Sequence, residues 1–392
     1  MGISRIVVLG SIIASCIFAS FFGGNIAYSL FYFTLVIPLG ALGYVVYVYC
    51  RFKIYQSVET KTVVKGEPVP YRIELSNEDR VTYHSIKMNF FKERSYVLDI
   101  NEEETYCMIP EEKCNIRSML VCQYRGEYEV GVDSVKITDF FNLFAITYPL
   151  LSKLKVIVLP RVIDLVDSHI IFINQDSKYS LYTKKNLEEE ISAESRKYQY
   201  GDSKKMIHWK LSAKKQMLMS RMTVAIPQKG VLLMVDLLGV KGKELEKLII
   251  QDLIIESMLA LSKYSLNKKI PCEVAWVERN IVTFTINNYL DFQSLYQKSS
   301  TIQFDADLTL DKVIQAKDEQ HGGNKQYILM THQLTSSLYT TLMSMNSRGN
   351  QGTIILAQTE LSLETKQLID LFEKSHLRVV CINPQTKLEE VL

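Results

Sequence analysis

The chain has 392 residues, enough at roughly 100–200 residues per domain for two soluble domains besides any membrane segment. Its 45 basic and 43 acidic residues leave a formal net charge of +2, so no overall field favours an anionic surface, and we expect no nucleic-acid partner. The seven cysteines are odd in number and none belongs to a C-x-x-C pair, which argues against a disulfide framework or a zinc ribbon and suits the reducing cytosol.

Two uncharged, apolar runs open the chain. They cover residues 6–22 and 26–50, and only a Gly-Gly-Asn connector separates them. A membrane-spanning helix needs about 20 apolar residues, with about 17 at the short end of the range, so both runs qualify. Because the connector is long enough only for a tight turn, residues 1–53 are predicted to form a two-helix transmembrane anchor with both ends on one side.

Basic residues flank this hairpin, namely Arg5, Arg51, Lys53, Lys61 and Lys65. Since Lys and Arg beside membrane helices stay preferentially in the cytoplasm, we expect a multi-pass protein of the cell membrane whose soluble domains are cytoplasmic. The alternatives are a cleaved signal peptide and a lipid-modified Cys16. Both are disfavoured because the chain stays apolar after Cys16 and a longer second run follows at once.

Residues 54–160 show strand after short strand. Alternating apolar and polar residues with turn residues between them predict strands at 58–64, 71–75, 85–91, 116–124, 128–132, 135–138 and 155–159. No convincing long helix interrupts them. The pattern is typical of an antiparallel β-sandwich, a fold that does not by itself decide function.

Residues 229–392 change rhythm and alternate strands with helices. Strands are predicted at 231–235, 272–277, 281–286, 326–330, 353–357 and 378–382, and helices at 243–264, 289–297, 336–346 and 364–374. Such alternation indicates an α/β domain with a mainly parallel sheet. Ligands of these sheets bind beyond the carboxyl ends of the strands.

Residues 161–228 connect the two domains and are interpreted as a linker that contains a dense block at 196–221. The block is rich in basic and aromatic residues. Asp202 is a good N-cap for a helix that starts at Ser203, and Ile207 and Leu211 then fall one turn apart on one face.

At this block the chain resembles the bacterial domain of unknown function 58 family. The signature of that family is roughly R-x-Y-x-x-G-D-x-x-R/K-x-I-D/H-W-K-x-S/T-A-R/K, followed by L-x-x-R. The positions that match it here are Arg196, Tyr198, Gly201, Asp202, Lys205, Ile207, His208, Trp209, Lys210, Ser212, Ala213, Lys214, Leu218 and Arg221.

A second stretch agrees with the same family. Its R-G-x-Y-x-x-G pattern resembles Arg125, Gly126, Tyr128 and Gly131, and its D-P-F-G-L-F pattern resembles the run from Asp139 to Phe144. Asn142 stands where the family has glycine, and Asn tolerates the left-handed conformation that this glycine would supply. With the V-Y-P-R-like residues 158–161 and the apolar hairpin, the resemblance covers essentially the whole chain.

The resemblance implies a C-terminal domain similar to the von Willebrand factor A fold. Complete domains of that kind hold a divalent metal through D-x-S-x-S after the first strand, because carboxylate and hydroxyl oxygens suit magnesium. Here only Asp236 remains, since Leu238 and Val240 cannot coordinate a metal. We therefore expect a degenerate metal site and no cofactor.

Two catalytic interpretations of the motifs are weak. Asp202, His208 and Ser212 could form a nucleophilic arrangement, but an N-cap, a surface residue and a helix-packing hydroxyl explain the same residues. The segment from Gly239 to Lys243 suggests a phosphate loop, but it lacks the required glycine spacing and the Ser or Thr after the Lys.

The basic and aromatic residues of the 196–221 block allow two interpretations. We favour Tyr198, Ile207 and Trp209 as interdomain core, with the lysines forming a solvated rim. The charges could also bind phosphates, anionic lipid or an acidic partner, because buried aromatics beside Arg mark protein interfaces.

The sequence as a whole favours a membrane-anchored, non-enzymatic scaffold or adaptor. The family resemblance implies protein partners, since relatives are associated with AAA+ ATPases of the MoxR type and with transglutaminase-like membrane proteins. The alternative function is a hydrolase or metal-dependent enzyme that uses the 196–221 block.

Overall fold

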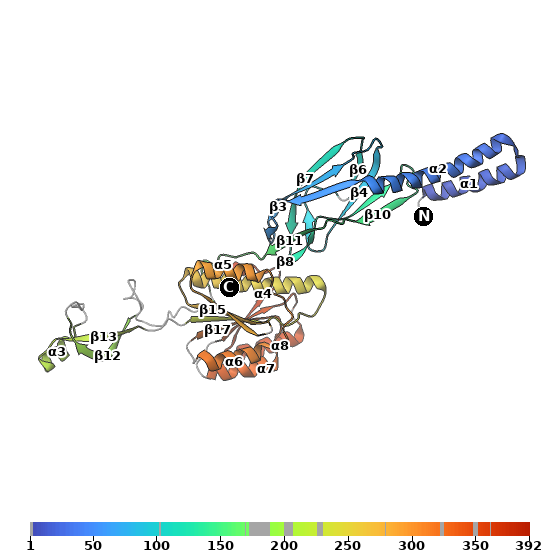
Figure 1. Ribbon diagram of the computed structural model, residues 1–392. Helices are drawn as coiled ribbons and strands as arrows, with labels where there is room; N and C mark the ends of the chain where they lie inside the picture. The colour runs from blue at the N-terminus through green and yellow to red at the C-terminus, as the bar shows by residue number, and fades with distance from the viewer. Residues whose placement is uncertain are drawn as a thin grey trace. The chain divides into compact units, whose positions relative to one another are not determined.

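The computed structural model describes residues 3–101, 103–168, 170–171, 189–199, 207–225, 230–278, 280–321, 325–347, 352–360 and 362–392 (Figure 1). The chain divides into two compact units. Unit 1 comprises Met1–Val162, Lys241–Glu256 and Ser294–Ile302, and unit 2 comprises Ile163–Val240, Ser257–Gln293 and Gln303–Leu392.

Unit 1 begins with two helices, α1 (Ile3–Phe22) and α2 (Gly24–Arg51), that pack side by side (Figure 1). Both are long and apolar enough to cross a membrane by length and composition. Gly23 and Gly24 have φ angles of 59° and 83°, a backbone conformation that glycine adopts without strain, and this allows the tight turn. The two apolar helices and their short connector are therefore confirmed.

Short strands fill the rest of residues 53–159. They are β1 (Lys53–Val58), β2 (Thr62–Val64), β3 (Pro68–Ser76), β4 (Tyr83–Phe90), β5 (Ser95–Val97), β6 (Thr105–Met108), β7 (Lys113–Cys122), β8 (Gly126–Val130), β9 (Val132–Thr138), β10 (Ala145–Pro149) and β11 (Leu154–Leu159). They form sheets of order β1-β3-β7-β5, β10-β9-β4-β6 and β2-β11-β8. All strand pairs are antiparallel except β2 with β11.

The predicted strand at 58–64 is wrong, because β1 ends at Val58 and β2 begins at Thr62. The two strands even lie in different sheets. Three short strands, β5, β6 and β10, were not predicted at all. Each has at most five residues, too few for a clear alternation.

The C-terminal turns of α2 belong to the hydrophobic core of these sheets. Val45 and Val48 are fully buried and cluster with Tyr71, Ile86 and Val135 of the strands. The helix is therefore built into the β region rather than attached to it by a free linker.

Beyond residue 230, six strands form one sheet of order β16-β15-β14-β17-β18-β19. They are β14 (Gly230–Val235), β15 (Cys272–Val277), β16 (Ile281–Ile286), β17 (Lys325–Thr331), β18 (Gly352–Ala357) and β19 (Arg378–Ile382). Only β16 runs antiparallel to its neighbour. Every residue of β14 is buried, which accounts for its continuous apolar sequence.

Helices alternate with these strands, as expected. They are α4 (Glu244–Asn267), α5 (Tyr289–Ser299), α6 (Leu310–His321), α7 (Ser336–Ser347), α8 (Leu363–Lys374) and α9 (Leu388–Val391). Figure 1 shows α6, α7 and α8 together, and their buried side chains share a core with the sheet. The mixed, mostly parallel α/β architecture is confirmed, whereas α6 and α9 were not predicted.

The region expected to be a linker contains regular structure. Strands β12 (Glu189–Lys197) and β13 (Met219–Ala225) pair antiparallel, and the short helix α3 (Trp209–Lys215) lies between them in sequence. We call residues 189–225, as far as the structure describes them, the hairpin–helix element. The predicted helical position of Ile207 is wrong, because Ile207 forms a β-bridge with Ser220 and α3 begins only at Trp209.

Candidate functional site

The hairpin–helix element carries most of the 196–221 block. His208 caps α3, since its Nδ1 accepts a hydrogen bond from the backbone N–H of Leu211 at 3.2 Å. The helix is closed at its other end by Gln216, which has a φ of 50°. These local bonds explain why α3 starts two residues after Ile207.

Ser212 joins α3 to β13 through its hydroxyl group. The Oγ atom donates to the carbonyl of His208 at 3.0 Å and accepts from the backbone N–H of Met219 at 2.9 Å. The hydroxyl is therefore held by the backbone, and the imidazole of His208 is held by its own cap. This geometry does not bring Ser212 and His208 together as a nucleophile and its base.

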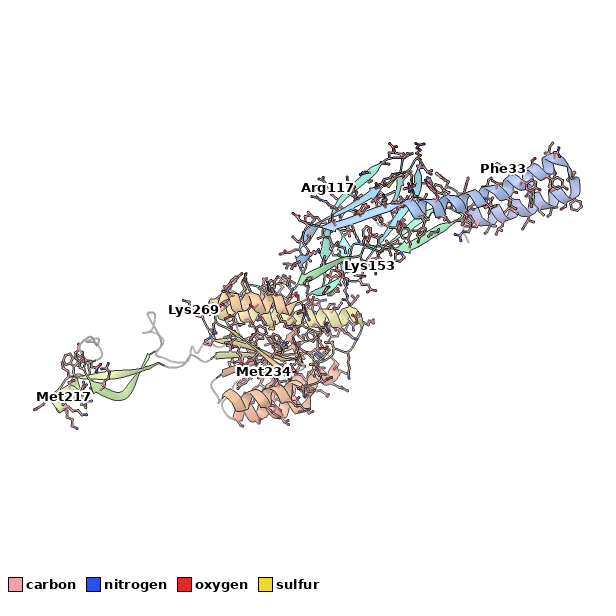
Figure 2. All side chains as sticks on the ribbon, in the orientation of Figure 1. Phe33, Arg117, Lys153, Met217, Met234 and Lys269 are labelled. Carbon is pink, nitrogen blue, oxygen red and sulfur yellow. The ribbon has the colours of Figure 1, made fainter. Side chains whose placement is uncertain are left out.

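Trp209 is exposed on the described part of the hairpin–helix element. It stands at the first position of α3 with a side chain that is 67% exposed, and its place in an interdomain core stays a prediction. Ile207 is buried as expected, and Tyr198 is half-buried. Met217 and Leu218 are exposed beside α3, and Met217 is labelled in Figure 2.

Basic residues are also exposed on this element. Lys210, Lys214 and Lys215 are all exposed on α3, and Arg196 is exposed on β12. The described part of the element thus combines a large exposed aromatic side chain with exposed cationic side chains. That composition suits an acidic protein surface better than a small-molecule pocket.

Several predicted positions lie outside the described residues. These are Gly201, Asp202 and Lys205, together with the side chain of Arg221. The proposed N-cap at Asp202 stays a prediction for the same reason.

The second predicted stretch supplies buried anchors of unit 1. Gly131 has a φ of 84°, and a Cβ at this position would lie 2.5 Å from Gln56 Oε1 and 2.6 Å from Tyr71 Oη. Those two groups hydrogen-bond to each other at 2.7 Å and accept from the N–H of Val132. Only glycine fits here without displacing a buried polar contact.

Arg125 is buried and binds three partners. Its Nη1 donates to the carbonyls of Ser299 and Ile302, both at 2.9 Å, and its Nε lies 3.5 Å from Asp252 Oδ1. Gly126, next in sequence, has a φ of 118° that turns the chain into β8. Tyr128 then donates to the carbonyl of Tyr124 at 2.8 Å.

Arg125 belongs to a buried ionic cluster in unit 1. Lys65 Nζ lies 2.8 Å from Asp252 Oδ2 and 2.7 Å from Glu256 Oε1, and Arg161 reaches Glu256 Oε2 at 3.4 Å. Both carboxylates are almost completely buried. The cluster fixes the first half of α4 against the loops that follow β2 and β7.

The charges of this cluster stabilise each other. Burial acts to lower the pKa of Lys65, but the charges and hydrogen bonds of Asp252 and Glu256 outweigh burial and raise that pKa. Burial raises the pKa of Asp252, against the opposing influence of Lys65 and Arg125. The ion pairs of this cluster join α4 to the segments around Lys65 and Arg125.

Asp139 and Phe144 bound a tight loop. Asp139 is buried, and its carboxylate accepts from the N–H groups of Phe141 at 3.1 Å and Phe144 at 2.8 Å. Asn142 takes the left-handed conformation that its side chain tolerates, with a φ of 55°. Phe144 packs half-buried against the core of the sheets.

Asp236 follows β14 at the carboxyl end of the α/β sheet, where the strand order reverses and such folds bind ligands. Its carboxylate accepts from Thr331 Oγ1 at 2.7 Å and from the N–H of Leu238 at 3.1 Å. His332 Nδ1 lies 4.0 Å away. Burial lowers the pKa of His332, against the opposing influence of Asp236.

This donor set does not fit a divalent metal. Leu238 and Val240 offer no side-chain oxygen, and both oxygens of Asp236 already accept hydrogen bonds within the protein. Within the described ranges, no group of three or more His, Cys, Asp or Glu side chains is arranged to hold a metal ion.

Comparisons with known proteins add no assignment. No protein-family model matches the chain, and no curated protein matches it. Among solved structures, it is similar to the CARDB domain of a Pyrococcus furiosus protein, with 14% identity over 28% of this chain and 89% of that one and a TM-score of 0.18. A second match is a GH20 β-N-acetylglucosaminidase from Vibrio harveyi, with 8% identity over 86% of this chain and 82% of that one, also at a TM-score of 0.18. Superpositions this poor carry no information on function.

Proposed function

We propose that the protein is a membrane-anchored, non-enzymatic scaffold whose hairpin–helix element binds a protein partner. The observation that carries the proposal is the exposure of Trp209 among lysines of α3. Trp is among the residues that most often dominate the binding energy of interfaces, and charged residues commonly form the rim around it.

The anchor is the helical pair α1 and α2. Both helices cross a membrane in this proposal. The basic residues Arg5, Arg51 and Lys53 keep the start of α1, the end of α2 and both units in the cytoplasm. The buried end of α2 supports this arrangement. Because the helix is part of the core of the β sheets, an α2 that spans the membrane also holds these sheets next to the membrane.

The C-terminal part is proposed to be a von Willebrand factor A-like domain that has lost its metal. The sheet order with one antiparallel edge strand supports this proposal, and so does the solitary carboxylate of Asp236. Such a domain serves as a rigid platform. The resemblance to the domain of unknown function 58 family is consistent with the same organisation.

The proposed partner is a MoxR-type AAA+ ATPase, as the family resemblance implies, with a transglutaminase-like membrane protein as the second candidate. The surface on the partner is expected to be acidic, because α3 carries three exposed lysines besides Trp209. The hydrolase alternative has no support from the described geometry, since His208 and Ser212 are both engaged by backbone groups.

Binding of the ATPase to the full chain in lipid nanodiscs tests this proposal. Trp209→Ala is expected to weaken the affinity about 30-fold, equivalent to about 2 kcal/mol at an interfacial hot spot. Tyr289→Ala is the matched control, since Tyr289 is an equally exposed aromatic residue of α5 and its loss is expected to change the affinity less than about twofold. Equal affinities for the Trp209→Ala variant and the unmodified chain would refute the role of Trp209.

A further inference from the structure

The length of α2 does not match the thickness of a bilayer. The helix has 28 residues, or about 42 Å at 1.5 Å per residue, whereas a hydrocarbon core is about 30 Å thick. From Ala41 onward one face of the helix is buried. Ala41, Val45 and Val48 are buried, and Val45 and Val48 belong to the core of the β sheets, whereas Leu42 and Val46 are exposed. Residues 24–40, which precede this partly buried stretch, span about 25 Å, the same length as residues 6–22 of α1.

The loop from Asp139 to Phe144 lies where this lipid-facing part of α2 ends. Phe140 packs on Tyr44 of α2 with ring centroids 4.7 Å apart. The Nε group of Arg5, at the start of α1, donates to the carbonyl of Leu143 at 2.8 Å. The loop therefore contacts both helices, α1 at its start and α2 in its second half.

Two large apolar side chains of this loop are exposed although the loop itself is fixed. Phe140 is 50% exposed and Phe141 is 56% exposed. The hydrogen bonds that Asp139 accepts from Phe141 and Phe144 hold the backbone, so the rings cannot fold inward without breaking buried bonds. Exposed aromatic residues beside a spanning helix are typical of the membrane interface.

An apolar groove of about 240 Å³ separates the loop from α2. Val36, Ile37, Gly40 and Ala41 line it on the helix, and Phe140 and Phe141 line it on the loop. Tyr44 and Asp139 also border the groove. The helix residues that line the groove belong to α2, so in the proposed anchor an acyl chain of the surrounding bilayer can reach the groove.

We propose that the loop is a second membrane contact and that the groove holds an acyl chain of a bilayer phospholipid. The inference rests on the proposed membrane anchoring. It places the edge of the hydrocarbon core near Ala41, about three turns before the end of α2 at Arg51. Phe140 and Phe141 then lie in lipid, and lipid covers the surface of these side chains that the protein leaves exposed.

Tryptophan fluorescence in vesicles tests the proposal with the full chain. Phe141→Trp is reconstituted into phosphatidylcholine that carries bromine on its acyl chains near the headgroup, and the emission of the unmodified chain is subtracted. We expect brominated lipid to reduce the added emission by at least about half, because bromine quenches only at contact. Leu151→Trp is the matched control, since Leu151 is fully exposed beyond the far end of β10, and its emission is expected to stay unchanged.

Phe33→Trp separates this proposal from the anchoring on which it rests. Phe33 lies exposed in the lipid-facing part of α2 and is labelled in Figure 2. If brominated lipid leaves Phe33→Trp unquenched, the anchoring itself fails. If it quenches Phe33→Trp and leaves Phe141→Trp as bright as Leu151→Trp, the loop proposal is overturned. Protection of Phe141→Trp from both brominated lipid and aqueous iodide would show that a second copy covers the loop, which also overturns it.

Discussion

Arg125→Ala should release the first half of α4 from the β region. Arg125 donates two hydrogen bonds to the carbonyls of Ser299 and Ile302 and pairs with Asp252. Its removal leaves two buried carbonyls unsatisfied and one buried carboxylate with a single remaining cation, Lys65. Breaking a buried pair in this way costs about 3–5 kcal/mol.

Hydrogen exchange measures this loss directly, because it reports the opening of α4 separately from the opening of the rest of the chain. A loss of about 3–5 kcal/mol corresponds to a fall in protection of about 100-fold or more for the amides of residues 244–256. The control is Arg161→Ala. Its side chain is mostly exposed and reaches Glu256 at 3.4 Å, so its removal should cost at most about 1 kcal/mol.

A double-mutant cycle sharpens the expectation. Asp252→Ala combined with Arg125→Ala removes both charges, so the combined loss should be smaller than the sum of the single losses by about 0.5–3 kcal/mol. Protection that falls less than tenfold in Arg125→Ala, or equally in Arg161→Ala, would refute the assignment of Arg125 as the buried anchor.

Two further predictions concern other buried groups. Gly131→Ala should destabilise unit 1 by about 2–4 kcal/mol, because the new Cβ meets Gln56 and Tyr71 in a left-handed backbone, and thermal unfolding monitored by circular dichroism measures it. Gly66→Ala, with a φ of 80° and open space around its Cα, should lose only about 1–2 kcal/mol, and equal losses for both variants would contradict the packing argument. Burial lowers the pKa of His332 in the folded state below its usual 6.5. The unfolded chain therefore binds this proton more readily, so the contribution of His332 to the free energy of unfolding is present above pH 6.5 and is lost as the pH falls through the lowered pKa. Denaturant titrations between pH 8 and pH 5 should show this decline, His332→Gln should flatten it, and an identical pH profile in both proteins would exclude His332 as its source.

The patterns that were easiest to predict are those with a long, simple period. The two apolar helices and the α/β strands, such as the fully buried β14, follow directly from runs of apolar residues. The residue types near Asp236 are also read directly from the sequence, since Leu238 and Val240 carry no side-chain oxygen. The hydrogen bond from Thr331 to Asp236 could not be predicted, since Thr331 belongs to β17, which lies far from Asp236 in the sequence.

The remaining features depend on tertiary contacts. The end of α2 is as apolar as the rest of the helix, so nothing in the sequence predicts that Val45 and Val48 enter a protein core. The ionic cluster joins Lys65 and Arg125 to α4 across more than one hundred residues. Trp209 was expected in an interdomain core, which depends on how separate parts of the chain pack, and its side chain is exposed on the described part of the hairpin–helix element.

Flotation of proteoliposomes tests whether the membrane-anchored chain recruits the proposed partner. The full chain is reconstituted, mixed with the purified MoxR-type ATPase and centrifuged through a density gradient at physiological salt. The account predicts that the ATPase floats with vesicles that carry the chain and remains at the bottom with empty vesicles. A chain that floats while the ATPase stays at the bottom would contradict the account.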